Sequence, residues 1–228
     1  MRVVISSGHG TFVGGAADLI NEVTEARRVV PQVAEYMRQC GAEVVEFYEN
    51  VATKQDDNVN NIIQYHNSKQ RDLDISVHFN SDNKGTRDAG IGTEVLFYTQ
   101  GSQANLALSV VSGISTASGL INRGAKPQSD FGFLSRTTAP AILIEVCFVN
   151  SREDVRLYQA NFNAICKAIA EAVTGVKIAS PPPQPEHWAD PAWDRLNAAG
   201  ITINEKRYPD RVTRAELFVL LDQVVNKG

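Results

Sequence analysis

Short apolar runs and longer amphipathic stretches alternate along the chain from its N-terminus to about residue 173. The first run, residues 3–5, is typical of a strand that is buried on both faces of a sheet. Residues 20–39 then repeat apolar positions at helical spacing, and Pro31 inside this pattern predicts a kink or a break. The alternation predicts an α/β fold in which a mostly parallel, twisted sheet is flanked by helices.

The same patterns place the remaining elements of this first part. Further strands are predicted at residues 42–48, 73–81, 92–98 and 141–146, and further helices at residues 58–68, 102–118 and 153–173. Leu73, Ile75 and Val77 alternate along the strand predicted at residues 73–81, the third along the chain. Residues 122–133 are predicted to form a loop that contains a short extended piece.

The composition changes after the last of these helices. Residues 180–185 read S-P-P-P-Q-P, which is typical of a stiff, extended spacer. We therefore expect a domain at residues 1–176, a linker at 177–186 and a small helical module at 187–228. The module is predicted to contain helices at 191–199 and 211–225, and a capping box of Thr213 and Glu216 opens the second. Because so small a unit buries little core, we expect it to depend on a partner.

Composition and charge narrow the class of protein. The chain has 228 residues, of which 43% are hydrophobic and 21% charged, as is ordinary for a soluble globular protein. A net charge of -4 with no basic tail or stripe argues against nucleic-acid binding. No apolar run is long enough for a transmembrane helix, and the N-terminus lacks the pattern of a signal peptide. We expect synthesis in the cytoplasm and, for action outside it, some other route of release.

The cysteines indicate a reduced interior. Cys40, Cys147 and Cys166 are odd in number, widely spaced and set among apolar residues. This arrangement favours reduced core residues over a disulfide framework or a cysteine-type zinc site.

Two predicted strands end in a histidine. His9 lies between two glycines after the first strand, and His78 lies near the end of the third. Because the carboxyl ends of adjacent parallel strands meet at one edge of a sheet, we expect the two imidazoles to lie close together there. Glu22 and Glu25, near the start of the first long helix, follow the loop after His9. Two imidazoles and one carboxylate around an open fourth position form the usual ligand set of a hydrolytic zinc site.

Glu145 is the one charged residue in an apolar predicted strand. Buried carboxylates are rare unless they are paired, bound to metal or catalytic. A glutamate beside a zinc site is suited to act as its general base.

Each candidate also has an ordinary structural interpretation. Glu22 or Glu25 would be a solvated acid favoured by the helix dipole, and the two histidines would be polar loop residues. His66, at a polar helix end, and His187, beyond the linker, are interpreted as surface residues.

Several motifs occur in an order that carries a family resemblance. Five motifs follow one another between residue 1 and about residue 173. They are a strand followed by G-H-G, a glutamate early in a helix, S-V-H-F-N-S, N-R-G and P-A-I-L-I-E-V-C-F-V-N. This order resembles the zinc-dependent N-acetylmuramoyl-L-alanine amidases of the Amidase_3 type. Members of that family cleave the amide between the lactyl group of N-acetylmuramic acid and L-alanine of the peptidoglycan stem peptide. The resemblance implies zinc as cofactor, His9 and His78 as ligands, and Glu145 as the catalytic glutamate.

The resemblance leaves the third ligand open. The family usually has glutamate followed by lysine at the helix start, whereas this chain reads N-E-V-T-E. Counting back without gaps from Tyr36 puts Glu22 at the ligand position, and Glu25, one turn later, is the alternative. Asn80, in the H-x-N pattern, is expected to support the site. Arg123, in N-R-G, is expected either to line the substrate groove or to form a structural salt bridge.

The C-terminal segment resembles a single, divergent S-layer-homology motif. The matching positions are Trp188, Trp193, Leu196, Thr213, Arg214 and Glu216. Such motifs commonly bind secondary cell-wall polymers, usually as three copies, so one copy implies oligomerisation or another partner. The alternative is a small helical appendage whose tryptophans pack its own core.

These resemblances together imply a phage or prophage endolysin that acts on peptidoglycan after holin-type release. A host autolysin of sporulation or mother-cell lysis shares the same features and is the main alternative. A non-catalytic peptidoglycan-binding protein and a zinc peptidase that cuts within the stem peptide are two further alternatives.

Overall fold

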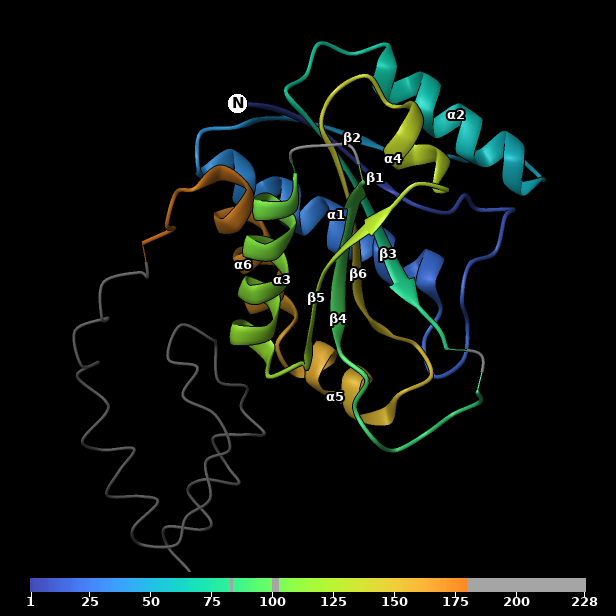
Figure 1. Ribbon diagram of the computed structural model, residues 1–228, viewed down its shortest axis with the longest axis vertical. Coiled ribbons are helices and arrows are strands. Elements are labelled where there is room, and N and C mark those ends of the chain that lie inside the picture. The colour runs from blue at the N-terminus through green and yellow to red at the C-terminus, as the bar shows by residue number, and fades with distance from the viewer. Residues whose placement is uncertain (83, 100–102, 180–228) are drawn as a thin grey trace, which may run out of the picture. The chain divides into compact units, whose positions relative to one another are not determined.

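One sheet of six strands organises the computed structural model, which describes residues 1–82, 84–99 and 103–179 (Figure 1). The strand order is β2-β1-β3-β6-β4-β5, and β4 runs antiparallel to β6 while the other neighbours are parallel. The bounds are β1 Arg2–Ser7, β2 Glu43–Phe47, β3 Leu73–Asn80, β4 Thr93–Tyr98, β5 Asn122–Gln128 and β6 Ala141–Phe148.

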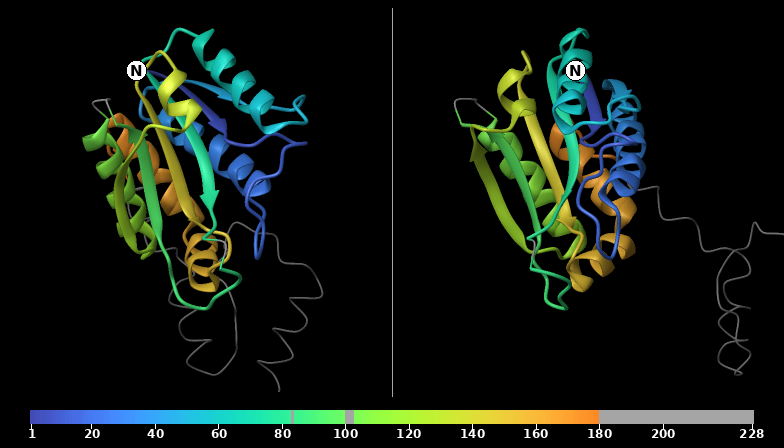
Figure 2. Two further views of the ribbon diagram at one scale, coloured as in Figure 1. Left: turned by 45° about the vertical axis from the view of Figure 1, so that its right-hand side comes forward. Right: turned by 90° about the vertical axis from the view of Figure 1, so that its right-hand side faces the viewer.

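Helices cover both faces of this sheet (Figure 2). On one face α1 (Glu22–Gln39), α3 (Ala104–Ser118) and α6 (Phe162–Thr174) pack against the strands, with α6 in contact with the other two. On the opposite face α2 (Gln55–Asn67) contacts the short helix α4 (Gly132–Arg136). After β6, α5 (Arg152–Ala160) contacts α3 and α6 and contributes Tyr158 to the core on their side of the sheet. The arrangement confirms the predicted α/β class with a mostly parallel sheet flanked by helices.

The alternation of side chains along the strands divides the interior into two cores. The larger core lies under α1, α3 and α6 and includes Ile75 of β3 and Ile144 of β6. The smaller core lies under α2 and α4 and consists of Ile62, Leu96, Phe133, Leu134, Ala141 and Leu143. Because β6 contributes to both cores, it is an almost uninterrupted apolar run.

β3 is different, because only one of its faces is apolar. Leu73, Ile75, Val77 and Phe79 enter the larger core, whereas the alternate positions that face α2 are all polar: Asp74, Ser76, His78 and Asn80. This polar row runs along the face of the sheet that carries the candidate site.

Two predicted segments differ from the structure. Residues 122–128, predicted to be a loop with only a short extended piece, form the complete edge strand β5, which accommodates Pro127 because an edge strand needs fewer ladder hydrogen bonds. The single helix predicted at 153–173 is two helices that meet at Asn161, and Ser151 caps the first by accepting a hydrogen bond from Asp154 N–H.

Two smaller expectations also need correction. α1 continues through Pro31, so no break occurs there; the buried apolar face of the helix, including Val30 and Val33, holds it on the sheet. Cys147 and Cys166 are free and buried as predicted, but Cys40, just after α1, is only half-buried. None of the helices in the described ranges is long and apolar enough to cross a membrane.

The predicted linker from residue 180 onward and the predicted module at 187–228 lie outside the described residues. The same holds for His187 and for the tryptophans and other positions of the S-layer-homology resemblance.

Candidate metal centre and active site

His9 follows β1 in a turn in which glycine is required for space. The N–H of Gly8 donates to the carbonyl of Val77 at 3.0 Å, which brings the turn against β3. A Cβ at Gly8 would overlap the imidazole of His78, so no other residue fits there without displacing that ring. The rings of His9 and His78 lie edge to face with their centroids 5.2 Å apart.

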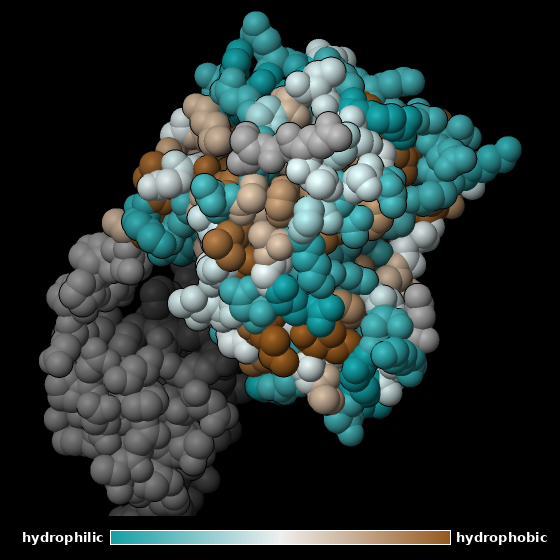
Figure 3. All heavy atoms as spheres, in the orientation of Figure 1, coloured by the Kyte–Doolittle hydropathy of each residue, from teal (hydrophilic) through white to brown (hydrophobic). Residues whose placement is uncertain are grey.

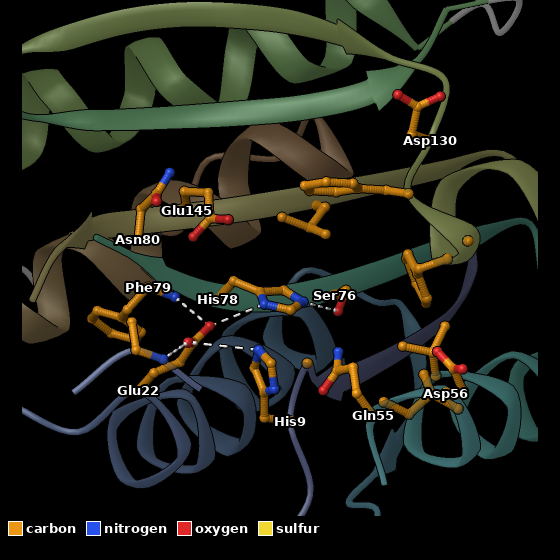
Figure 4. Close-up of a pocket in the computed structure, with 18 of the residues that line it drawn as sticks. His9, Glu22, Gln55, Asp56, Ser76, His78, Phe79, Asn80, Asp130 and Glu145 are labelled. Atoms are coloured by element: carbon orange, nitrogen blue, oxygen red, sulfur yellow. Dashed lines mark hydrogen bonds and ion pairs between the residues drawn. The ribbon is translucent and has the colours of Figure 1, made fainter. Parts of the chain in front are cut away.

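Glu22, the first residue of α1, points its buried carboxylate at both histidines (Figure 4). Its Oε1 lies 3.0 Å from His78 Nδ1 and accepts a hydrogen bond from the N–H of Phe79 at 3.0 Å. Its Oε2 lies 3.6 Å from His9 Nε2 and accepts a hydrogen bond from the N–H of Ala16 at 2.6 Å. Asn21 is the N-cap of α1, and its side-chain oxygen accepts a hydrogen bond from Thr24 N–H. This cap fixes the start of the helix and so places Glu22 in its first turn.

Glu25, the alternative, lies one turn further along and has other partners. Its Oε2 accepts hydrogen bonds from Arg28 Nη1 at 2.6 Å and from the hydroxyl of Tyr158 at 2.7 Å. Of the two glutamates, it is Glu22 that the fold places with the histidines.

The three side chains fit the donor set of a divalent metal. One ligand atom each from His9, Glu22 and His78 lies within 4.8 Å of the others. Donors around a tetrahedral zinc ion are separated by roughly 3.3 Å, as its bond lengths of about 2.0–2.1 Å require. The distances between Glu22 and the two ring nitrogens are therefore close to what one shared ion needs.

The electrostatics of Glu22 and His9 suit metal binding, whereas those of His78 favour a proton that a metal would have to displace. Burial opposes charge on Glu22, but the hydrogen bond and charge of His78 outweigh it and lower the pKa of the carboxyl. Burial lowers the pKa of His9, and the neighbouring His78 lowers it further. Burial also acts to lower the pKa of His78, yet the hydrogen bond and charge of Glu22 raise it on balance. An ionised carboxylate and a neutral imidazole are the forms that bind metal.

Glu145 lies beside this cluster on β6. It is the register partner of His78 on β3, which puts both side chains on the α2 face of the sheet. The residue is 8% exposed, and its Oε2 has no hydrogen-bond partner among the described residues. Burial raises the pKa of Glu145 to about 7, the charges of Glu22 and Glu94 raise it as well, and His78 acts in the opposite direction.

Asn80 and Arg123 meet at a residue that the sequence analysis did not single out. Asn80 Nδ2 donates to Glu94 Oε1 at 3.0 Å, and Arg123 Nε donates to Glu94 Oε2 at 2.6 Å. Lys126 Nζ lies 2.5 Å from the same oxygen. Because β4 is antiparallel to β6, Glu94 near its start is the register partner of Glu145. A lone acid in the apolar strand T-E-V-L-F-Y is the signal that would have found Glu94, as it found Glu145.

His66 is not a surface residue, so that prediction is wrong. Its side chain is completely buried, with Nδ1 2.8 Å from Asp74 Oδ1 and Nε2 3.0 Å from Ser6 Oγ. The residue falls on the same face of α2 as Ile62 and Ile63, four and three positions earlier, and this face packs on the sheet. His66 is therefore buried because of its position on the helix, although the surrounding sequence is polar.

A cavity of about 1070 Å³ connects these groups. His9, Glu22, His78 and Glu145 line one part of it, while Asp56 of α2 and Asp130, just before α4, line another (Figure 4). Asn80 also lines it, whereas Arg123 is not among its lining residues. Hydrophilic side chains gather over α2, at the upper right of the face drawn in Figure 3. The cavity is large enough for a substrate much bigger than a single amino acid.

Comparison with known proteins gives a consistent result. A family model for N-acetylmuramoyl-L-alanine amidases, Amidase_3, matches residues 3–175. An uncharacterized protein of Clostridium perfringens (strain 13 / Type A) is 33% identical over 185 residues, covering 78% of this chain and 53% of that protein. The chain thus spans about half the length of the curated relatives it matches, since the second, also from Clostridium perfringens, is likewise covered over 53%.

Solved structures share the fold. The catalytic domain of an endolysin targeting Clostridia difficile superposes with a TM-score of 0.70 at 26% identity, covering 78% of this chain and 99% of that one. The N-acetylmuramoyl-L-alanine amidase AmiC2 of Nostoc punctiforme superposes with a TM-score of 0.63 at 26% identity, covering 77% of this chain and 96% of that one.

Proposed function

Since the chain belongs to the N-acetylmuramoyl-L-alanine amidase family, we propose that it hydrolyses the amide between N-acetylmuramic acid and L-alanine in peptidoglycan. One observation carries this proposal beyond the family match. His9, Glu22 and His78 bring three metal-ligand atoms together in a cavity that also contains the unpartnered carboxylate oxygen of Glu145. A ligand set with a free acid beside it is the arrangement that metal-assisted hydrolysis requires.

His9, Glu22 and His78 would hold the metal, and zinc suits this nitrogen and oxygen donor set. A bound zinc ion supplies a Lewis acid for the scissile carbonyl and lowers the pKa of a water molecule towards ~7. The hydrogen bonds from the N–H groups of Ala16 and Phe79 hold the Glu22 carboxylate in its orientation. The backbone thereby fixes one ligand before any metal arrives.

Glu145 is the proton carrier in this proposal. Its carboxylate accepts a proton from the attacking water and then donates a proton to the leaving amino group of L-alanine. A pKa of about 7 suits both steps, since a group that titrates near the operating pH gives and takes protons readily. Asn80, held by Glu94, lines the cavity next to this residue and is proposed to contact substrate. The ion pair of Arg123 with Glu94 favours the structural alternative for that arginine.

At the level of the whole protein we propose an endolysin with a catalytic domain at 1–176, a linker at 177–186 and a wall-binding module at 187–228. The similarity to an endolysin catalytic domain supports this role. A host autolysin is the second candidate, because amidases such as AmiC2 of Nostoc punctiforme are equally similar in sequence.

The decisive test is to digest purified cell walls with the full chain and identify the released fragments by mass. The proposal expects stem peptides that begin with a free L-alanine amino group, and glycan strands that retain the lactyl group. Fragments cut within the stem peptide would instead identify a peptidase, and no released fragment would identify a binding protein. A chelator should abolish release, and added zinc should restore it.

The module is tested separately in the full chain. Retention on purified walls should fall when Trp188 and Trp193 are both changed to alanine, if the segment binds a wall polymer. Equal retention of the unaltered chain and of this double variant would contradict a wall-binding role for the segment.

A further inference from the structure

The second ring nitrogen of His78 has a buried partner that the proposed chemistry does not use. His78 Nε2 lies 3.0 Å from Ser76 Oγ, while Nδ1 faces Glu22. Ser76 lies two residues earlier on β3, on the same face of the strand, and is 1% exposed (Figure 4). Serine and histidine are therefore adjacent members of the polar row on β3.

This contact supports the tautomer of His78 that metal binding requires. A neutral imidazole has one N–H and one lone pair, and the nitrogen that faces a metal must present the lone pair. Without a metal, Nδ1–H donates to the Glu22 carboxylate, which can only accept, and the Ser76 hydroxyl donates to Nε2. With a metal at Nδ1, the ring hydrogen would be on Nε2, and the hydroxyl oxygen of Ser76 would accept it. Partners of this kind fix the orientation of a metal-binding histidine as well as its tautomer.

The surroundings of the ring leave it little freedom. Gly8 lies so close to Cε1 and Nε2 that a Cβ there would overlap the ring. The side chain of His78 is only 16% exposed, and the nearly buried Ser76 leaves little access for a water molecule to replace its hydroxyl. The Ser76 hydroxyl is thus the partner that the fold provides for Nε2.

We propose that Ser76 is a positioning residue that holds His78 with Nδ1 presented to the metal. The inference rests on the proposed function, because it assigns Ser76 a role towards the metal centre formed by His9, Glu22 and His78. It predicts that Ser76 affects how tightly the metal binds, although Ser76 itself contributes no ligand.

The chain contains a matched control for this role. Ser6 Oγ also lies 3.0 Å from an imidazole Nε2, that of His66, and Ser6 is completely buried. Ser6 on β1 is the register partner of Ser76 on β3, so the two hydroxyls occupy equivalent positions on neighbouring strands. The difference between them is that His78 lies in the candidate metal centre and His66 does not.

The test compares Ser76→Ala, Ser6→Ala and Ser76→Thr in the full chain. Zinc dissociation constants are measured by competition with a coloured chelator, and urea unfolding of the metal-free proteins reports stability. Ser76→Ala should weaken zinc binding by about 10- to 100-fold, the usual cost of losing such a partner. Ser6→Ala should change the zinc dissociation constant by less than about threefold while lowering stability to a similar degree. Ser76→Thr, which keeps the hydroxyl, should restore much of the affinity.

A spectroscopic measurement distinguishes positioning from a general loss of structure. In the zinc-loaded chain, ¹⁵N shifts of the His78 ring should identify Nε2 as the protonated nitrogen, and Ser76→Ala should broaden or shift these resonances. Unchanged zinc affinity in Ser76→Ala, or equal losses in Ser76→Ala and Ser6→Ala, would overturn the proposal. Zinc binding that depends on Ser76 in a chain that releases no wall fragments would contradict only the proposed reaction. An unaltered chain that binds no zinc would overturn both.

Discussion

The imidazoles of His78 and His66 make the same two hydrogen bonds in different parts of the molecule. In each ring Nδ1 faces a carboxylate, Glu22 Oε1 at 3.0 Å for His78 and Asp74 Oδ1 at 2.8 Å for His66. In each ring Nε2 lies 3.0 Å from a serine hydroxyl. A carboxylate, an imidazole and a serine hydroxyl joined in a row by hydrogen bonds are therefore not enough to define a functional site.

The second partner of each carboxylate makes the difference. Asp74 accepts hydrogen bonds from Arg71 Nε at 2.9 Å and from Arg71 Nη2 at 2.9 Å, so a fixed cation already balances its charge. Glu22 instead faces a second imidazole, His9, and its further contacts are backbone N–H groups. The first arrangement is complete without a ligand, whereas the second has room for one positive ion.

Access to the cavity is the other difference. His66 and Asp74 are completely buried, whereas His9, Glu22 and His78 line a cavity with Glu145 beside them. His66, Asp74 and Ser6, called the interior group below, stabilise the packing of α2 on the sheet. The group at the cavity, in contrast, can exchange ligands and protons. The predictions below test this contrast, beginning with the largest expected effect.

Glu145 is the residue that the candidate site has and the interior group lacks. Glu145→Gln should reduce the release of stem peptides from cell walls by about 10²- to 10⁴-fold, because the proton carrier is lost while its shape is kept. Zinc affinity should stay within about threefold, since Glu145 is not among the proposed ligands. Release at near the unaltered rate would show that another group carries the proton.

The two glutamates of α1 provide the next contrast. Glu22→Gln should weaken zinc binding by on the order of 100-fold or more, because a ligand contributes at least as much as the partners that support it. Glu25→Gln should leave zinc affinity nearly unchanged and lower stability, since it disturbs the hydrogen bonds from Arg28 and Tyr158. Chelator competition and urea unfolding measure the two effects, and the reverse ranking would make Glu25 the ligand.

His66 should matter for stability alone. His66→Ala should lower the free energy of unfolding by about 3 kcal/mol, because it leaves a cavity and deprives Ser6 and Asp74 of a buried partner. Urea unfolding followed by circular dichroism measures the loss. Zinc affinity of the folded variant should stay unchanged, and a tenfold loss of that affinity would show that the two imidazoles are coupled.

The smallest effect is a pH dependence of stability in the metal-free chain. Burial lowers the pKa of His66 and the nearby Arg71 lowers it further, although Asp74 acts to raise it. In the unfolded chain this histidine titrates near ~6.5. Below that pH the unfolded state binds a proton that the folded state does not, so the free energy of unfolding falls as the pH falls.

The contribution of His66 to the slope of the unfolding free energy against pH is at most about 1.4 kcal/mol per pH unit, the value for one proton. The control is His66→Gln, which does not titrate. The free energy of unfolding of the unaltered chain and of His66→Gln is measured between pH 5 and pH 7.5. The two curves should be parallel above about pH 6.5 and separate below it. Parallel curves throughout would mean that His66 binds its proton equally in both states.

Much of the fold could be predicted because the strands have clear apolar patterns. The alternation in β3 and the apolar run of β6 follow directly from burial on one or both faces. β5 was predicted only as a short extended piece because Pro127, Gly124 and two basic residues interrupt its pattern, and pairing with β4 is what makes it a strand. The break between α5 and α6 was missed because it is confined to Asn161.

The candidate site was partly predictable for a similar reason. The parallel order of β1 and β3 predicted that His9 and His78 would lie together, and their rings are 5.2 Å apart. Their role as ligands, with Glu22, stays a prediction. Spacing could not separate Glu22 from Glu25, because one helical turn moves a carboxylate by only about 5 Å along the axis. His66 was misjudged because its partners, Ser6 and Asp74, lie on strands distant in sequence.

The place of β6 in the sheet constrains when the sheet can form during synthesis. This strand is the last of the six along the chain, yet it lies between β3 and β4, so within the sheet β2-β1-β3 and β4-β5 are joined only through it. During synthesis the sheet therefore cannot be completed until residues 141–148 have emerged, and pairings that span so much sequence form slowly. Glu145 belongs to that strand, so a nascent or truncated chain that ends before β6 lacks the proposed proton carrier.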